Sequence, residues 1–406
     1  TVTIKKLSVS EGFKRTFPNA AGGGIYSQEN ILLIGCNLKN NEAHEGGGLY
    51  ITSNKVVTIK NSIFENNKGD FGGALYQRSG GLGHAVVKDS RFIANHGNNY
   101  GGAFYLAGNA LIINSVFKSN TSKFSGAINL PQSGTVSVKS SVFSGNSAES
   151  FAVMAKNGGS SNISIINSIF YGNLSEGNEG TNLKEIVRLT SSDGITEIVN
   201  SAFVNNSGGV RYSGSSEINS LANTVFANNS DFDVNIQEPM IPNIDNSFVP
   251  SITGTAFTEN ILTEGDLGFL DIANNDFHLS SNSVLIDSGK NMDSLTIEDW
   301  GTGNKSFPVS DIAGNQRIAG GAIDIGPYEF STTRPTITKF DVEGTRKVNQ
   351  VLSFVTDATA SSGRIIASYE IDNGSGTFVS ASSEFSVTYS TAGNKSVRVK
   401  VTDDQG

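Results

Sequence analysis

The chain contains little cysteine, little charge and no long hydrophobic run. Among its 406 residues Cys36 is the one cysteine, so neither an intramolecular disulfide nor a cysteine-based zinc site can form. No stretch of about 18 apolar residues occurs, so no membrane span is expected. Charged residues make up 17% of the chain and its net charge is −9, so it lacks the basic stripe of a nucleic-acid-binding protein. No signal peptide is recognisable at the start, and we expect the chain to be the interior of a longer protein.

What the chain has in abundance is a repeat of about 26 residues. The repeat carries the pattern Asn-Ser-x-Phe-x-x-Asn, with small variations, and a weaker first copy has Leu38 in the phenylalanine position. The phenylalanines are Phe64, Phe92, Phe117, Phe143, Phe170, Phe203 and Phe226. The asparagines that end the pattern are Asn67, Asn95, Asn120, Asn146, Asn173, Asn206 and Asn229.

Two further β-rich segments complete each period. A Val/Ile-rich segment precedes each phenylalanine, and a segment such as Gly72–Tyr76 (GGALY) follows the early ones. Three short strands separated by Gly, Asn and Ser turns predict one turn of a three-sheet solenoid. No window sustains a helical stripe, and the segments recur as triplets rather than as hairpin pairs. We therefore predict an all-β fold, in which residues 1–330 form a right-handed, single-stranded parallel β-helix.

A parallel stack places equivalent side chains in columns about 4.8 Å apart. The phenylalanines are expected to stack inside. The asparagines are expected to form a structural ladder at a turn, where they bond to the coils above and below and tolerate a left-handed backbone. Because neighbouring side chains in a strand point to opposite faces, an outward column of exposed tyrosines is expected. Its members are Tyr26, Tyr50, Tyr76 and Tyr105.

The repeat decays after Asn229, and the end of the chain has a different organisation. Residues 264–330 are interpreted as terminal coils or a cap, and residues 331–334 as a linker. Residues 335–406 contain alternating strands with turns every 8 to 12 residues, which predict a small Ig-like β-sandwich.

These features resemble known families. The run from Asp266 to Glu329 resembles the terminal coils of secreted bacterial right-handed β-helix proteins, which are common in Bacteroidota. The repeat resembles that of chlamydial polymorphic outer-membrane proteins, which are surface adhesins. Residues 369–374 and 389–403 resemble the polycystic-kidney-disease-type Ig-like domain, although Tyr369 replaces the usual tryptophan. The resemblance implies an extracellular or cell-surface location and export by a secretion apparatus, such as the type IX system.

Candidate chemistry is sparse. No carboxylate recurs at one position of adjacent coils, and His44 and His96 lie two coils apart, so no catalytic residue and no resident metal are predicted. Aspartates are dense near residues 264–330, where calcium is conceivable but local turns explain them better. Arg317 is expected to pair with one of these aspartates as a structural clamp.

The tyrosine column supports the sharpest hypothesis, which is stacking on the sugar rings of a polysaccharide or of a host or neighbouring-cell glycan. The alternative is that the tyrosines stack on one another and stiffen the sheet. We therefore expect a non-enzymatic adhesin or extended stalk, a fragment of a larger multidomain secreted chain, with no cofactor. The other candidates are a β-helix polysaccharide lyase or glycoside hydrolase, with its site in an insertion between Asn173 and Ile195, and passive cargo of a secretion apparatus.

Overall fold

The computed structural model describes residues 1–14, 20–78, 83–131, 134–149, 153–157, 161–177, 183–191, 194–214, 219–292, 306–330, 335–360 and 365–403. The predicted linker 331–334 and parts of the insertion between Asn173 and Ile195 lie outside these residues. The chain divides into two compact units, Thr1–Phe330 and Ser331–Gly406.

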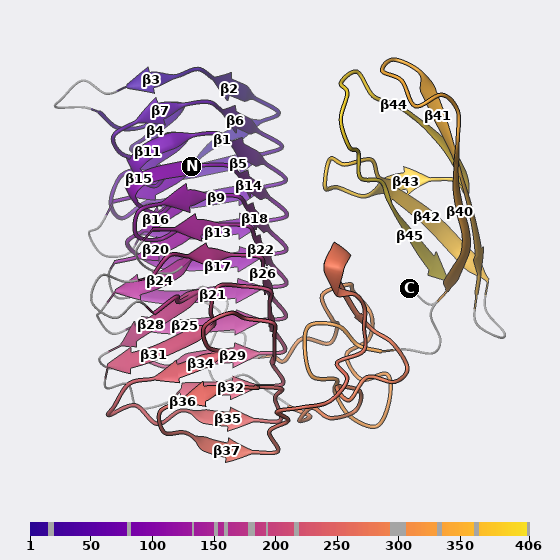
Figure 1. The fold of residues 1–406 in the computed structure, drawn as a ribbon. Coiled ribbons are helices and arrows are strands. Elements are labelled where there is room, and N and C mark those ends of the chain that lie inside the picture. The colour runs from indigo at the N-terminus through magenta and orange to yellow at the C-terminus, as the bar shows by residue number, and fades with distance from the viewer. Residues whose placement is uncertain are drawn as a thin grey trace. The chain divides into compact units, whose positions relative to one another are not determined.

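The first unit is a parallel β-solenoid, in which each coil hydrogen-bonds to the next (Figure 1). Equivalent residues of neighbouring early coils, such as Asn37 and Ile63, are 26 residues apart, so the predicted parallel solenoid with coils of about 26 residues is confirmed. One detail of the prediction is corrected, because the strands form four parallel sheets rather than three. The additional sheet consists of the strands that follow the ladder asparagines from Asn41 to Asn173, together with β3 in the first coil. These strands have two to five residues and are mostly polar, so no clear strand signal for them is present in the sequence.

The four sheets are named A to D in chain order within a coil. Sheet A comprises β1 (Val2–Lys5), β5 (Ile31–Ile34), β9 (Val56–Lys60), β13 (His84–Lys88), β17 (Asn109–Ile113), β21 (Gly134–Lys139), β25 (Ser161–Ile166), β29 (Thr196–Val199), β32 (Asn219–Ala222), β35 (Asn243–Asp245) and β37 (Phe257–Glu259). Sheet B comprises β2 (Ser8–Ser10), β6 (Asn37–Lys39), β10 (Ile63–Glu65), β14 (Arg91–Ile93), β18 (Val116–Lys118), β22 (Val142–Ser144), β26 (Ile169–Tyr171), β30 (Ala202–Val204) and β33 (Val225–Ala227).

Sheet C comprises β3 (Phe13–Lys14), β7 (Glu42–Ala43), β11 (Lys68–Phe71), β15 (His96–Tyr100), β19 (Thr121–Ser122), β23 (Ser147–Ala148) and β27 (Leu174–Ser175). Sheet D comprises β4 (Ile25–Ser27), β8 (Leu49–Ile51), β12 (Leu75–Gln77), β16 (Phe104–Leu106), β20 (Ile128–Leu130), β24 (Met154–Asn157), β28 (Val187–Ser191), β31 (Val210–Gly214), β34 (Val234–Ile236) and β36 (Ile252–Thr253).

The phenylalanines of the repeat fill the interior of the solenoid. All seven are fully buried at the centre of the sheet B strands, from Phe64 to Phe226. Neighbouring rings stack with centroids 4.5–5.1 Å apart, close to the spacing between strands. The apolar side chains of sheets A and D surround this column and complete a continuous core.

The ladder asparagines lie buried at the corner between sheets B and C. The Nδ2 group of Asn120 donates to Oδ1 of Asn146 in the next coil at 2.9 Å and to the carbonyl of Phe92 in the preceding coil at 2.9 Å. Its Oδ1 accepts from the backbone and side chain of Asn95, each at 3.0 Å. The same pattern recurs in consecutive coils from Asn41 to Asn229. From Asn41 to Asn206, each amide therefore ties three coils together, and none of these described amides leaves a buried polar atom unpaired.

The left-handed backbone of this corner belongs to a different residue from the one predicted. The residue before each ladder asparagine has φ near +55°, as at Asn66 (53°), Ala94 (52°) and Ser119 (55°), whereas the ladder asparagines do not. The corner between sheets A and B has the same geometry, and here the first residue of the repeat pattern is left-handed, as at Asn61 (48°) and Asn167 (50°). The following serine forms a second ladder, in which Ser115 Oγ accepts from the Ser90 backbone. The pattern Asn-Ser-x-Phe-x-x-Asn thus specifies two successive corners and the core residue between them.

Residues 264–330 are named the lateral segment. In residues 264–292 and 306–330, no strand joins the parallel sheets, so of the two interpretations, terminal coils or a cap, the terminal coils are corrected to a covering segment. After β37 the chain turns back and runs beside the later coils (Figure 1). This segment contains the antiparallel pair β38 (Phe269–Asp271) and β39 (Asp276–Leu279), separated by the 3₁₀ helix η1 (Ile272–Asn274).

The second unit contains two three-stranded antiparallel sheets. One comprises β40 (Thr336–Glu343), β41 (Val351–Thr359) and β44 (Glu384–Thr388); the other comprises β43 (Val379–Ala381), β42 (Ile366–Asp372) and β45 (Arg398–Asp403). Phe354, Ile371 and Val387 are its buried apolar residues. At one end of β42, the carboxylate of Asp372 accepts hydrogen bonds from the backbones of Gly374 and Gly376 and pairs with Arg398.

Candidate functional site

The four tyrosines predicted to form a column lie at one position of sheet D. Tyr26, Tyr50, Tyr76 and Tyr105 pair in register through β4, β8, β12 and β16. Their rings are almost parallel, with interplanar angles of 2–10°, and neighbouring centroids are 5.0, 5.4 and 5.0 Å apart. Inside the column, each ring face is therefore covered by the ring of the next coil.

The exposure of the column differs from the expectation. Tyr26, at its N-terminal end, is 46% exposed, but Tyr50 is 2% exposed, and Tyr76 and Tyr105 are half-buried. The prediction of four exposed tyrosines is thus wrong for Tyr50. Rings stacked at the strand spacing cover both faces of Tyr50 and of Tyr76, which the alternation rule for a single strand does not take into account, and at Tyr50 the hydroxyl group also bonds Arg78. Sugar stacking requires an accessible ring face, and the inner members of this column do not offer one.

A second aromatic column lies where sheet C ends, beside the tyrosines. Phe71 stacks on Tyr100 at 6.1 Å, and Tyr100 stacks on Phe124 at 4.7 Å. Phe71 and Tyr100 meet Tyr105 edge to face, at 5.6 and 6.4 Å. We name these two columns together the aromatic cluster. Phe71, Tyr100 and Phe124 are 29 and 24 residues apart, each spacing one residue off the 28 and 25 residues between the ladder asparagines of these coils, so the repeat did not predict the second column.

Charged side chains surround the tyrosine hydroxyl groups. Burial, and secondarily the carboxylate of Glu45, raises the pKa of Tyr50 and Tyr76, while Arg78 beside Tyr50 opposes the rise. Burial also raises the pKa of Tyr105. These phenols are therefore neutral at physiological pH and offer both a hydrogen-bond donor and an acceptor.

A polar chain on sheet C links the two histidines that the sequence places two coils apart. His44 Nδ1 lies 2.5 Å from Asp70 Oδ2, in the intervening coil. Asp70 accepts from the amide of Asn98, whose oxygen lies 3.1 Å from His96 Nε2. The His44 side chain is 50% exposed, and its ring meets Phe71 edge to face at 5.6 Å. The pair His44–Asp70 therefore borders the aromatic cluster.

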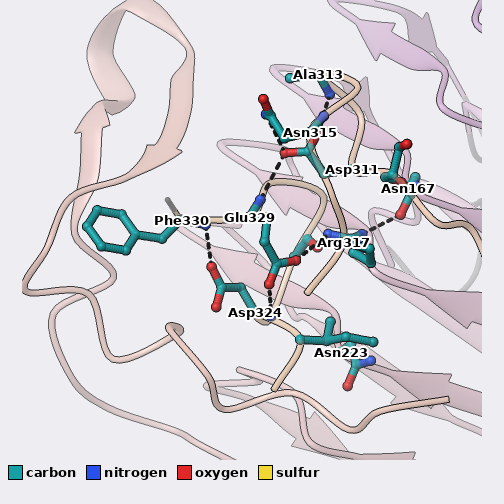
Figure 2. A network of polar contacts seen from close by, with 12 residues as sticks. Asn167, Asn223, Asp311, Ala313, Asn315, Arg317, Asp324, Glu329 and Phe330 are labelled. Carbon is teal, nitrogen blue, oxygen red and sulfur yellow. Dashed lines mark hydrogen bonds and ion pairs between the residues drawn. The ribbon is translucent and has the colours of Figure 1, made fainter. Parts of the chain in front are cut away.

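The densest polar network joins the lateral segment to the solenoid (Figure 2). The buried guanidinium of Arg317 lies 3.4 Å from Glu329 Oε2 and donates to the side-chain oxygen of Asn167, a corner residue of the solenoid. The side-chain oxygen of Asn200, in the amide orientation that suits its neighbours, accepts from Arg317 at 2.8 and 2.9 Å. Arg317 thus acts as the clamp expected from the sequence, but its ion-pair partner is a glutamate rather than an aspartate.

Backbone donors satisfy the carboxylates of this network. Asp311 accepts from the backbones of Ala313, Asn315 and Glu329 at 2.7–3.0 Å, and Asp324 accepts from those of Asp287 and Phe330. Because these carboxylate oxygens already accept backbone hydrogen bonds, they have little capacity left to coordinate a cation. Among the described residues, no group of three or more His, Cys, Asp or Glu side chains is arranged to hold a metal ion.

Burial changes the acidity of this network. Burial, and secondarily the neighbouring Asp324 carboxylate, raises the pKa of Glu329 to about 8, against the opposing effect of Arg317. Burial also raises the pKa of Asp324 and lowers that of Arg317. Within the described part of the network, the carboxylates of Glu329, Asp311 and Asp324 face the buried guanidinium of Arg317, so a proton on one of them relieves their repulsion. The network therefore has a structural role, which is to hold the lateral segment against the solenoid.

The comparisons with known proteins add no name to this architecture. No protein-family model matches the chain, and no curated protein matches it. Within the described residues, no helix has the length and apolar character needed to cross a membrane.

Proposed function

We propose that this chain is a non-enzymatic adhesive or stalk-forming module of a larger secreted or cell-surface bacterial protein. The observation that carries the proposal is the asparagine ladder, in which each amide from Asn41 to Asn206 bonds its coil to both neighbouring coils. A solenoid braced in this way keeps its outward side chains at a fixed spacing of about 4.8 Å along a rigid axis. Rigid spacing of surface groups is what an extended stalk or an adhesive surface requires.

The aromatic cluster is the surface that we propose for ligand contact. Its ring edges and neutral hydroxyl groups, together with Glu45, Arg78 and the exposed ring of Tyr26, suit the hydroxyl-rich surface of a glycan. The proposed contact therefore uses hydrogen bonds and ring edges, with face stacking confined to the column's exposed end.

The remaining assignments rest on resemblance. We infer that the second unit is an Ig-like spacer of the polycystic-kidney-disease type, and that the chain is a Bacteroidota protein exported by the type IX apparatus. The two three-stranded antiparallel sheets of the second unit are compatible with an Ig-like domain.

Binding to a panel of polysaccharides and cell-surface glycans tests the proposed surface. Tyr76→Phe keeps the stacked ring and removes its hydroxyl group, and Tyr26→Ala removes the exposed end of the column. We expect each variant to weaken glycan binding by about tenfold, the loss of one or two hydrogen bonds or ring contacts. Tyr389→Phe in the second unit is the matched control. Binding that both variants leave unchanged would sink the proposed contact surface.

A β-helix polysaccharide lyase or hydrolase is the second candidate, and the His44–Asp70 pair favours it. Asp70 holds Nδ1 of His44 at 2.5 Å, which leaves Nε2 to accept a proton beside the aromatic cluster. This candidate predicts product from anionic polysaccharides, with calcium added, that His44→Gln abolishes. The absence of product across a broad substrate panel would leave the binding proposal.

A further inference from the structure

The lateral segment is attached to the solenoid by side contacts rather than by continuation of the parallel sheets. On the outer face of sheet B, Phe277, Leu279, Leu285 and Ile325 pack against apolar side chains of the later coils. These solenoid residues are Ile169, Ala202, Val204, Val225 and Ala227. Around the corner, on the outer face of sheet A, Met292 and Phe307 pack against Ile166 and Val199. The segment thus holds the corner between sheets A and B from both sides.

The corner itself provides a row of polar docking points. Asn223 donates to the carbonyl of Lys290 at 3.0 Å and accepts from its backbone N–H at 2.7 Å. Asn167 donates to the carbonyl of Ser310 at 2.8 Å, and Asn246 donates to that of Ser288 at 3.2 Å. In an early coil the side chain of the equivalent Asn114 instead donates to Asp89, at the same corner position of the preceding coil. The later corner asparagines therefore recognise the lateral segment, and Arg317 lies over two of them.

The position of the lateral segment in the chain determines which mechanical load it carries. The chain leaves the solenoid after β37, forms the lateral segment and continues from Phe330 into the second unit. Any pull on the second unit consequently reaches the lateral segment before it reaches a coil. Phe330 itself is held by its backbone N–H, which donates to Asp324.

We propose that the lateral segment is a releasable latch in series between the coils of the solenoid and the second unit, and that Arg317 is the positioning residue that locks it. The latch detaches under load while the coils stay intact, because its attachments are side-chain contacts at a corner, whereas each coil is held by continuous main-chain pairing and two ladders. Release would lengthen the connection by up to roughly 220–240 Å, the extended length of 67 residues (264–330). This inference concerns the fold and does not rest on glycan binding.

Hydrogen exchange on the full chain tests whether the latch opens separately. In Arg317→Met, we expect exchange within residues 264–292 and 306–330 to accelerate on the order of 100-fold, because the buried carboxylates lose the Arg317 guanidinium that faces them. Protection of β26, β30 and β33 should persist, since their main-chain partners are strands of neighbouring coils. Arg317→Lys, which keeps the charge but not the planar fork, should give an intermediate rate. Loss of protection in the latch and these strands together, or in neither, would overturn the proposal.

Pulling the full chain between its two ends gives a second measurement. We expect a release event of the stated length before any solenoid event, and at a lower force in Arg317→Met. The second unit gives an event of similar length, so Arg398→Met is the matched control: it breaks the pair with Asp372 and should shift only that other event. The proposal fails if Arg317→Met shifts no event, or if coils unravel before the latch is released.

Discussion

The early and later coils of the solenoid share one interior and differ on the outside of sheet B. In the early coils the residues that flank the core phenylalanine include Glu65, Arg91 and Lys118, and these lie partly or fully in solvent. From β26 onward the flanking residues carry no charge and lie under the lateral segment, and all except the half-buried Tyr171 are buried, as at Val204 and Ala227. The phenylalanine and ladder asparagine are the same in both regions.

This difference separates two kinds of information in one repeat. The fixed positions of Asn-Ser-x-Phe-x-x-Asn specify corners, ladder and core, and so they specify that a coil forms. The variable positions on either side of the phenylalanine point outward and specify what covers the coil. Solvent covers the early coils and the chain's own lateral segment covers the later ones.

Truncating the core column should destabilise both regions equally. Phe117→Ala in an early coil and Phe203→Ala in a later coil each remove a fully buried ring that stacks on two others. We expect each to lower the free energy of unfolding by about 3–5 kcal/mol. Chemical denaturation followed by circular dichroism measures this. A difference of more than about 2 kcal/mol between the two variants would show that the interiors are not equivalent.

A charge on the outer face should separate the two regions. Val204→Glu places an unpaired carboxylate under the lateral segment, in a fully buried position. We expect a loss of about 3 kcal/mol, or detachment of the lateral segment, which limited proteolysis detects as new cleavage within residues 264–330. The matched variant Lys118→Glu changes a charge at the equivalent exposed position and should leave the proteolysis pattern unchanged.

The interior of the solenoid could be predicted from the sequence because its core and ladder residues recur from repeat to repeat. Phe64 to Phe226 and Asn67 to Asn229 recur at one position of each coil, and only a stack gives such a pattern a structural reason. The covering of the later coils by the lateral segment was harder to predict, because it depends on contacts between residues far apart in the chain, such as Asn167 and Arg317. A signal was nevertheless present: charge disappears from the positions flanking phenylalanine after Lys118.

The candidate site was only partly predictable for a related reason. The register of Tyr26, Tyr50, Tyr76 and Tyr105 followed from the repeat, but the burial of Tyr50 depends on contacts between coils, which are ring stacking and the bond to Arg78. The link from His44 through Asp70 to His96 passes between side chains of three different coils. Column positions were readable from sequence, whereas side-chain directions within a column were not.

The lateral segment and the second unit should respond oppositely to pH. The pKa of Glu329 is raised in the folded state, so its stabilising contribution is complete below about pH 4.5 and is lost as pH rises through about 8. Arg317, Asp311, Asp324 and, beyond it, Asp287 face this group. We therefore expect the protection of the lateral segment from hydrogen exchange, corrected for intrinsic exchange rates, to fall as the pH rises from about 5 to about 9. Each limit of this range carries a tolerance of about one pH unit.

In the second unit the sign is reversed. Although burial opposes it, hydrogen bonds from Arg398 and from the backbones of Gly376 and Gly374 lower the pKa of Asp372. Its contribution is therefore present above its unfolded pKa and is lost as pH falls through the lowered value. Glu329→Gln should flatten the alkaline response of the lateral segment and leave the acidic response of the second unit unchanged. A Glu329→Gln protein with the same alkaline response would show that another group controls it.

The smallest effect is expected where solvent already covers the coil. Glu65 forms an ion pair with Lys39 of the preceding coil at 2.6 Å, with both side chains at least one-third exposed. Glu65→Gln removes the charge and keeps the shape, and such exposed pairs contribute about 0–1 kcal/mol. We expect a change in the free energy of unfolding below about 0.5 kcal/mol that vanishes at high salt. A larger or salt-independent loss would mean that the outer face of the early coils is also covered, and the distinction between the two regions would no longer hold.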